Sequence, residues 1–592
     1  MQGIDLTSYY QDQIQKHEVA LAKVKQDLSG SSLLRLLLFV LTAFGIYLSF
    51  GNTRLILAIL ILGLALFLYL VSRHTDLQYT RDKLQALVKL NQTEIMVLRR
   101  EFHQLPEGNE YKDPLHYFSQ DIDLFGRGSF YQYLNRTALQ QGSETLAHLL
   151  AENSIDDILE KQKAIEELSK MPEWRKEFTA IASLVKTETK YSTIIKWMEH
   201  HKPFIPSIMK VLPLLVSIIS GLLFLGFFMD FVSGWIVTGW FFVGLGITGR
   251  YLKPINKLSS DTGKIQSTFL QYQKLIVELE VLEFKSSLLQ KKRESIIHET
   301  ERTSKTLKKF AKLLNALDQR NNVIISIFAN AFLLRDLQLS HAIEQWIRNH
   351  GSKNKEWFET IAFFDAYNSL GNFTFNHPTY VFPRLSDEDI VLRSKEAGHP
   401  LLPLEKCVTN DFQINKEQFF IITGANMAGK STFLRTVSLH IVMANVGLPV
   451  CSKAFKYSPI KLITSMRTTD SLTDDESYFF SELKRLKFIV DEIQNDNYFI
   501  VLDEILKGTN STDKAKGSRK FVERLVGSKS TGIIATHDLS LCKVAQEFPE
   551  IENHYFDAEI IDNELHFDYK FKEGICQNMN ASFLLKKMGI VD

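Results

Sequence analysis

A glycine-rich loop between an apolar segment and a helical pattern is the first feature of this sequence that indicates chemistry. The apolar segment 419–423 precedes the loop, and Thr432 opens the helical pattern. The loop consists of Gly424, Ala425, Asn426, Met427, Ala428, Gly429, Lys430 and Ser431. This order fits the motif GxxxxGK[ST], whose backbone N–H groups and helix N-terminus hold phosphate groups. The sequence therefore predicts a site for ATP and Mg²⁺, with Lys430 at the β- and γ-phosphates and Ser431 on the metal.

An acidic pair follows a second apolar segment. Residues 498–502 are Tyr, Phe, Ile, Val and Leu, and Asp503 and Glu504 come directly after them. An apolar strand that ends in two acidic residues is typical of the Walker B element of nucleotide hydrolases. We expect Asp503 to hold Mg²⁺ and Glu504 to polarise the attacking water. The alternative is a buried strand with a solvated acidic end.

A third apolar segment, residues 532–536, ends at His537. In an open α/β sheet, ligands bind in the crevice outside the carboxyl ends of the strands. We therefore expect His537 to sense or stabilise the γ-phosphate, and a purely structural histidine is the alternative.

The elements that must position these residues alternate between strand and helix patterns, which predicts an α/β domain over residues 386–592. Pro378 and Pro383 mark its boundary. Residues 73–203 and 251–385 have helical patterns, so the rest of the chain is predicted to be mainly helical. The predicted fold class is a multidomain α+β protein: an α-helical body with four transmembrane helices and a C-terminal α/β P-loop ATPase domain.

The four transmembrane helices are predicted from four apolar runs. These runs are residues 33–50, 55–71, 211–229 and 231–249. Each is close to the roughly 20 residues that a helix needs to cross the hydrocarbon core. They predict two hairpins, 33–72 and 204–250, the first preceded by a cytoplasmic lead-in, residues 1–32. Buried core helices are the alternative.

Basic residues flank the outer ends of both hairpins, whereas Arg54 is the one basic residue in the two turns. The positive-inside rule then predicts a multi-pass protein of the inner or plasma membrane. The N-terminus, the middle segment and the ATPase domain are expected in the cytoplasm, with membrane lipid as a partner. Net charge gives no argument for nucleic acid, because 69 Lys and Arg residues face 68 Asp and Glu residues.

Together the motifs resemble those of the MutS family of DNA mismatch-repair ATPases. TGANMAGKSTFLRT resembles the Asn-Met form of that family's glycine-rich loop, and Ala-Thr-His at 535–537 resembles its switch histidine. Residues 503–513 resemble its Walker B element and following loop, with Leu-Lys in place of Gly-Arg at 506–507. Gly-His-Pro at 398–400 and Asn410 resemble the start of its ATPase domain. Cys-Val at 407–408 stands where the family places an aromatic residue against adenine.

Two further segments resemble the parts of the family that take part in dimer formation. Residues 476–482, Glu-Ser-Tyr-Phe-Phe-Ser-Glu, resemble the family's signature segment, and the tail 573–589 resembles its helical dimerisation end. The resemblance implies that Ser477 reaches the γ-phosphate of a partner subunit. It thus implies a homodimer with composite ATP sites, which ATP closes and hydrolysis reopens.

A weaker resemblance places the start of the family's helical lever domain at residues 128–150. The family's N-terminal mismatch-reading domain, with its Phe-x-Glu wedge, has no counterpart in the sequence. We therefore expect ATP-dependent DNA binding without ordinary mismatch recognition. DNA as a partner is implied by the resemblance alone.

Two other functions stay open on the sequence. A membrane-embedded ATPase could move its transmembrane helices or a membrane partner without DNA. ABC-type transporters share the layout of the motifs, but the LSGGQ-like signature they need is replaced by residues 476–482. A scaffold whose nucleotide only regulates assembly is the other alternative, and the complete set of hydrolytic residues argues against it.

Overall fold

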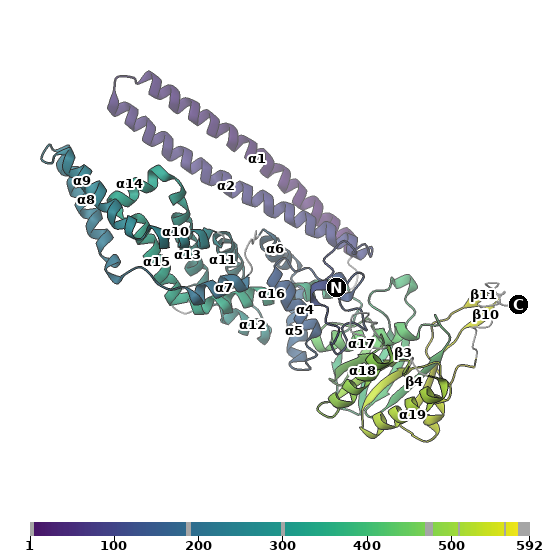
Figure 1. Ribbon diagram of the computed structural model, residues 1–592. Helices are drawn as coiled ribbons and strands as arrows, with labels where there is room; N and C mark the ends of the chain where they lie inside the picture. The colour runs from purple at the N-terminus through teal and green to yellow at the C-terminus, as the bar shows by residue number, and fades with distance from the viewer. Residues whose placement is uncertain are drawn as a thin grey trace.

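The computed structural model has three parts: an N-terminal helical hairpin, a helical body beside it, and an α/β domain at one end of the body (Figure 1). The parts described are residues 5–184, 191–263, 265–297, 302–467, 478–506, 510–561 and 564–577. The mixed fold predicted from the sequence, with a helical body and a C-terminal α/β domain, is confirmed.

The hairpin consists of α1 (Leu6–Leu48) and α2 (Thr53–Leu98). Side chains of Asp5 and Asn52 cap the two helices by accepting hydrogen bonds from backbone N–H groups in their first turns. The predicted lead-in and the first apolar run form one continuous helix. Both helices are long and apolar enough to cross a membrane. Most of their large apolar side chains between residues 33 and 69 are exposed.

The prediction of four transmembrane helices is wrong for the second pair. Residues 211–249 form α8 (Leu212–Phe228) and α9 (Gly234–Arg250), each of 17 residues. Such helices are about 25 Å long, shorter than the roughly 30 Å hydrocarbon core. In the described parts of the chain, α1 and α2 are the two single helices that are long and apolar enough to cross a membrane.

The helical body is built around one buried helix, α16, which packs against α4, α5 and α6. The helices of the body are α3 (Phe130–Leu134), α4 (Gln140–Ala151), α5 (Ile158–Ser169), α6 (Pro172–Ser183), α7 (Tyr191–His200), α10 (Leu252–Gly263), α11 (Gln266–Val281), α12 (Ser287–Glu294), α13 (Thr303–Asp318), α14 (Val323–Leu333), α15 (Arg335–His350) and α16 (Asn354–Asn376). Short 3₁₀ turns lie at Asn109–Tyr111, Ser207–Lys210, Gln319–Asn321, Gly351–Lys353, Leu404–Lys406 and Leu541–Gln546.

Buried polar contacts fasten the hairpin to the body. The hydroxyl of Tyr10 in α1 donates to the side-chain oxygen of Asn376 in α16 at 2.6 Å. Glu94 in α2 pairs with Arg136 at 2.6 Å, and both side chains are nearly buried. A buried charge must be paired to be tolerated, so these contacts fix the base of the hairpin on the body.

The α/β domain has a six-stranded sheet in the order β12–β9–β4–β8–β7–β6. Its strands are β4 (Phe419–Gly424), β6 (Lys461–Ser465), β7 (Tyr498–Asp503), β8 (Thr531–Ala535), β9 (Ile551–Phe556) and β12 (Lys572–Glu573). The five strands from β9 to β6 pair in parallel, and β12 pairs antiparallel to β9. Parallel strands buried on both faces read as apolar runs, which is why the sequence reveals β4, β7 and β8 so clearly.

In the described residues of this domain, three helices and two smaller sheets accompany the six-stranded sheet. The helices are α17 (Lys430–Val446), α18 (Tyr478–Glu492) and α19 (Ser511–Gly527). One small sheet has the order β1–β5–β2–β3, with β1 (Arg384–Leu385), β2 (Ile390–Ala397), β3 (Asn410–Asn415) and β5 (Ala454–Tyr457). The other pairs β10 (Glu559–Ile561) with β11 (Glu564–His566).

Candidate nucleotide-binding site

The glycine-rich loop connects the end of β4 to the first residue of α17. Gly424 has φ +145°, and a Cβ there would lie 2.4 Å from the carbonyl oxygen of Phe556. Gly429, directly before the helix, has φ +108°. Both conformations are open to glycine and strained for other residues. The two glycines therefore let the chain turn tightly, so that the N-terminus of α17 faces the cavity.

Lys430 is the first residue of α17, and its side chain extends back to the start of this loop. Its Nζ donates hydrogen bonds to the carbonyl oxygens of Gly424 at 2.7 Å and Ala425 at 3.0 Å. Burial lowers the pKa of Lys430, and the negative charges of Asp503 and Glu504 oppose that shift. The ammonium group thus occupies a partly desolvated position, where its attraction for a phosphate group is strong.

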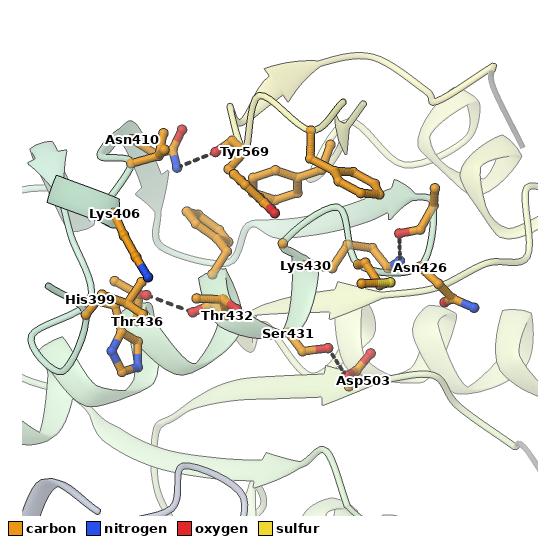
Figure 2. Close-up of a pocket in the computed structure, with 18 of the residues that line it drawn as sticks. His399, Lys406, Asn410, Asn426, Lys430, Ser431, Thr432, Thr436, Asp503 and Tyr569 are labelled. Atoms are coloured by element: carbon orange, nitrogen blue, oxygen red, sulfur yellow. Dashed lines mark hydrogen bonds between the residues drawn. The ribbon is translucent and has the colours of Figure 1, made fainter. Parts of the chain in front are cut away.

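Ser431 and Asp503 meet although they lie 72 residues apart. The Ser431 hydroxyl donates to Oδ2 of Asp503 at 2.8 Å (Figure 2). Hydroxyl and carboxylate oxygens are the hard ligands that Mg²⁺ prefers. The pair therefore has the donor chemistry expected of a magnesium site beside a nucleotide.

His537 and Glu504 complete the cluster from the ends of β8 and β7. Nε2 of His537 is 3.3 Å from Nζ of Lys430 and 3.3 Å from Oε1 of Glu504. Burial and the Lys430 charge lower the pKa of His537, whereas Glu504 and Asp503 raise it. The net shift is downward, so the neutral ring prevails near pH 7. A neutral histidine beside Lys430 avoids a second positive charge in the loop.

One cavity of about 960 Å³ is lined by Lys430, Ser431, Asp503, Glu504 and His537. From the predicted nucleotide-binding loop, the cavity also contacts Ala425, Asn426, Met427, Gly429 and Thr432. Gly424 supplies a carbonyl to Lys430, and Ala428 is buried beneath the loop. The structure therefore brings the predicted loop, magnesium ligands and hydrolytic pair together in one crevice.

An aromatic wall of the cavity was not predicted from the sequence. Tyr569 lies over the loop, so that a Cβ at Gly429 would be 3.1 Å from its ring. Asn410 fixes this wall, because its amide donates to the Tyr569 carbonyl at 3.1 Å (Figure 2). The same amide accepts from the Phe571 N–H at 2.9 Å. Phe567 stacks on Tyr569 with ring centroids 5.9 Å apart. The alternating aromatic residues at 567, 569 and 571 were the available signal.

Other predicted residues lie outside the described part of the chain. These are Ser477, residues 507–509 of the loop after the acidic pair, and the tail from residue 578. The described end of the signature segment does contact the site's edge, because Oε1 of Glu482 accepts the backbone N–H of Leu506 at 2.6 Å. This bond ties α18 to the chain that follows Glu504.

Comparisons with known proteins agree with this geometry. The model of the family "MutS domain V" matches residues 420–586. MutS protein homolog 4 of Homo sapiens is 30% identical over 213 residues, which are 34% of this chain and 22% of the relative. DNA mismatch repair protein MSH3 of Candida albicans is 31% identical over 251 residues, 39% of this chain and 24% of the relative.

A bacterial relative shows the same partial coverage. DNA mismatch repair protein MutS of Thermotoga maritima is 27% identical over 259 residues, 43% of this chain and 32% of the relative. The chain thus spans less than a third of the length of these three relatives. The family match covers the loop, the acidic pair and the histidine that meet in the cavity, so this part of the chain is similar to the MutS domain V.

Proposed function

We propose that this protein binds ATP with Mg²⁺ and hydrolyses it to ADP and phosphate. The observation that carries the proposal is the convergence of Lys430, Ser431, Asp503, Glu504 and His537 on one cavity. These five side chains come from segments up to 107 residues apart. The match of residues 420–586 to the family model MutS domain V supports the same activity.

In the proposed reaction, ATP phosphates take the place of the loop carbonyls as acceptors for Lys430. The N–H groups at the start of α17 hold the phosphates, and Ser431 and Asp503 hold the metal. Bound Mg²⁺ would neutralise charge on the phosphate oxygens. Glu504 orients and polarises the attacking water, and neutral His537 holds Glu504 and contacts the γ-phosphate.

The proposed wider role is that of an ATP-driven, DNA-binding homodimer. Relatives named as DNA mismatch repair proteins support DNA as the partner. The partner's Ser477 would complete each ATP site, so that ATP closes the dimer and hydrolysis reopens it. The α/β domain can pass this motion to the helical body through Asp123, which pairs with Arg435 of α17 at 3.2 Å and Arg467 at 2.5 Å.

We also propose that α1 and α2 anchor the protein in a membrane, with the ATPase domain in the cytoplasm. Their length, apolar composition and exposed apolar side chains support this. The same helices favour a second candidate function, in which ATP hydrolysis moves the membrane helices or a membrane partner without DNA.

The test is the ATPase rate of the full chain in lipid nanodiscs, with and without homoduplex, mismatched and branched DNA. We expect Mg²⁺-dependent turnover that DNA stimulates, and DNA affinity that falls with salt. Glu504→Gln should retain ATP binding and lose about 100-fold or more in turnover. Glu550→Gln, an exposed carboxylate outside the cavity, is the matched control.

Each part of the proposal fails on a different result. Equal turnover by Glu504→Gln and the wild-type protein would remove the assigned role of Glu504. Turnover that responds to lipid composition but ignores every DNA would favour the second function. Absence of turnover under all conditions, with ATP still bound, would point to a nucleotide-regulated scaffold.

A further inference from the structure

Three apolar helices from distant parts of the sequence pack together at the end of the body farthest from the α/β domain. They are α8, α9 and α14, and we call this unit the apolar cap (Figure 1). The apolar runs of the sequence indicated α8 and α9 but not α14, whose 11 residues are too few for a membrane span. The tertiary structure adds α14 to the cap from about 75 residues further along the chain.

Several polar groups of the cap lie between its helices. The Ser220 hydroxyl, 3% exposed as a residue, donates to the Phe332 carbonyl at 2.8 Å and accepts from the Trp240 indole at 2.8 Å. Gly244 lies so close to α14 that a Cβ there would be 1.9 Å from the Ala331 carbonyl oxygen. Small residues at close contacts and internally bonded hydroxyls are typical of helices packed within lipid.

The outer surface of the cap is apolar. Trp235 is 85% exposed, Phe228 79% and Ile324 71%. Residues 211–229, 231–249 and 323–334 contain no charged side chain, and the charges that bound the cap, including Asp230, Arg250 and Arg320, lie at the ends of its helices. This arrangement, polar inside and apolar outside, is the reverse of that in a water-soluble domain.

The position of the cap matches that of the proposed anchor. The turn between α1 and α2 and the turn between α8 and α9 lie toward the same end of the molecule, and the α/β domain lies at the other end (Figure 1). A bilayer that contains the apolar part of α1 and α2 would therefore be within reach of the cap. Exposure of the cap's large apolar side chains to water would be strongly unfavourable.

We propose that the apolar cap is a second membrane-contacting surface, whose partner is the acyl-chain layer of the bilayer that holds α1 and α2. The proposal rests on the proposed membrane anchoring and extends it from the hairpin to the helical body. Two contacts with one membrane fix the orientation of the helical body. During the ATP cycle the α/β domain would then move relative to the bilayer. Exposed Ile324, Ile325 and Phe328 of α14 take part in this contact with α8 and α9.

The test places a fluorescent label at one cysteine of the full-length protein in phosphatidylcholine nanodiscs. The background is Cys407→Ser, because Cys407 is half-buried and the other three native cysteines are buried. Labels are placed with Ile324→Cys in the cap, Ile61→Cys in α2, and Leu270→Cys in α11. Ile61 and Leu270 are exposed apolar positions like Ile324, which makes them matched references. Nitroxide on lipid acyl chains reports lipid contact, and iodide reports water contact.

We expect the labels at positions 324 and 61 to lose emission to the lipid nitroxide, and the label at 270 to lose it to iodide. Iodide quenching alone at position 324 would overturn the proposal. Protection from both quenchers there would also overturn it and would indicate contact with a second protein copy. Lipid quenching at 61 but not at 324 leaves the anchor and refutes the cap. Lipid quenching at 324 but not at 61 refutes the anchor and also overturns the proposal, whose bilayer is the one that holds α1 and α2. Lipid quenching at neither position refutes both.

Discussion

At the scale of one residue, Lys430 donates hydrogen bonds to two carbonyl groups of its own loop. ATP can bind Lys430 only if these two hydrogen bonds are broken. The phosphates must replace acceptors at 2.7 and 3.0 Å. An exchange of hydrogen bonds has a small net free energy, of about 1 kcal/mol per bond. Affinity must therefore come from charge, from the N–H groups of α17 and from contact with the base.

The contact with the base is predicted to depend on Tyr569. Tyr569 and Val408 both line the cavity, and the sequence has Cys407 and Val408 in place of the family's aromatic residue. Aromatic stacking contributes about 0.5–1.5 kcal/mol. We expect Tyr569→Ala to weaken ATP binding about threefold to tenfold and Tyr569→Phe to leave it nearly unchanged. Titration with a fluorescent ATP analogue measures both, and equal affinity of all three proteins would remove Tyr569 from the base site.

At the scale of one element, the chain that leads into α4 is held by a side chain from another helix. Asp365 of α16 is buried and accepts the backbone N–H groups of Ala138 and Leu139 ahead of α4. Burial raises the pKa of Asp365 to about 7, and these hydrogen bonds oppose the shift. Gly142 makes room for the carboxyl group, since a Cβ there would lie 2.1 Å from Oδ2 of Asp365.

Gly142→Ala is therefore predicted to displace Asp365 from the backbone N–H groups that precede α4. Loss of hydrogen bonds to a buried carboxyl group costs about 1–3 kcal/mol, although alanine favours helix by up to about 1 kcal/mol. We expect a lower free energy of unfolding, measured by urea titration in detergent. Gly527→Ala in α19, where a Cβ meets open space, is the control and should be neutral or stabilising. A neutral Gly142→Ala would contradict the proposed fit.

Helix α17 carries a buried histidine that makes stability depend on pH. His440 is fully buried and its Nε2 donates to the Gly398 carbonyl at 3.0 Å. Burial lowers the pKa of His440 to about 3, from 6.5 in the unfolded chain. Its neutral ring therefore contributes stability in full above pH 6.5, and this is lost as pH falls toward 3.

We expect the free energy of unfolding to fall between pH 6.5 and 4.5, by at most about 1.4 kcal/mol per pH unit from this histidine. His440→Gln can keep the N–H donor without titrating, so its stability should depend less on pH. His148→Gln, at a side chain that is 73% exposed, is the control. Unfolding midpoints measured across this range test the prediction, and identical slopes for His440→Gln and wild type would refute it.

At the scale of the whole molecule, the ATP cycle is predicted to need two subunits. Lys430→Ala disables a subunit's own site, and Ser477→Ala disables the site of its partner. An equal mixture should contain about half mixed dimers, each with one intact site, and recover about a quarter of wild-type turnover. Each variant alone should be inactive. No recovery on mixing, with exchange of subunits verified by light scattering, would contradict composite sites.

The sequence by itself determined much of the site and the two long apolar helices, α1 and α2. β4, β7 and β8 are apolar because both faces of a parallel sheet are buried, and the loop's glycines are set by backbone sterics. These are local requirements, so they leave a signal in consecutive residues. The same holds for the apolar runs, although sequence alone overestimated the length of α8 and α9 as spans.

Only the tertiary structure decided which of these segments meet. Strand β8 lies between β4 and β7, and this order brings His537 between Lys430 and Glu504. The wall at Tyr569 depends on Asn410, 159 residues away, and the cap depends on α14 reaching α9. Such contacts arise from strand order and from packing between distant segments, whose free energy depends on three-dimensional neighbours. No pattern of consecutive residues encodes those neighbours, which is why the sequence could identify the pieces but not their arrangement.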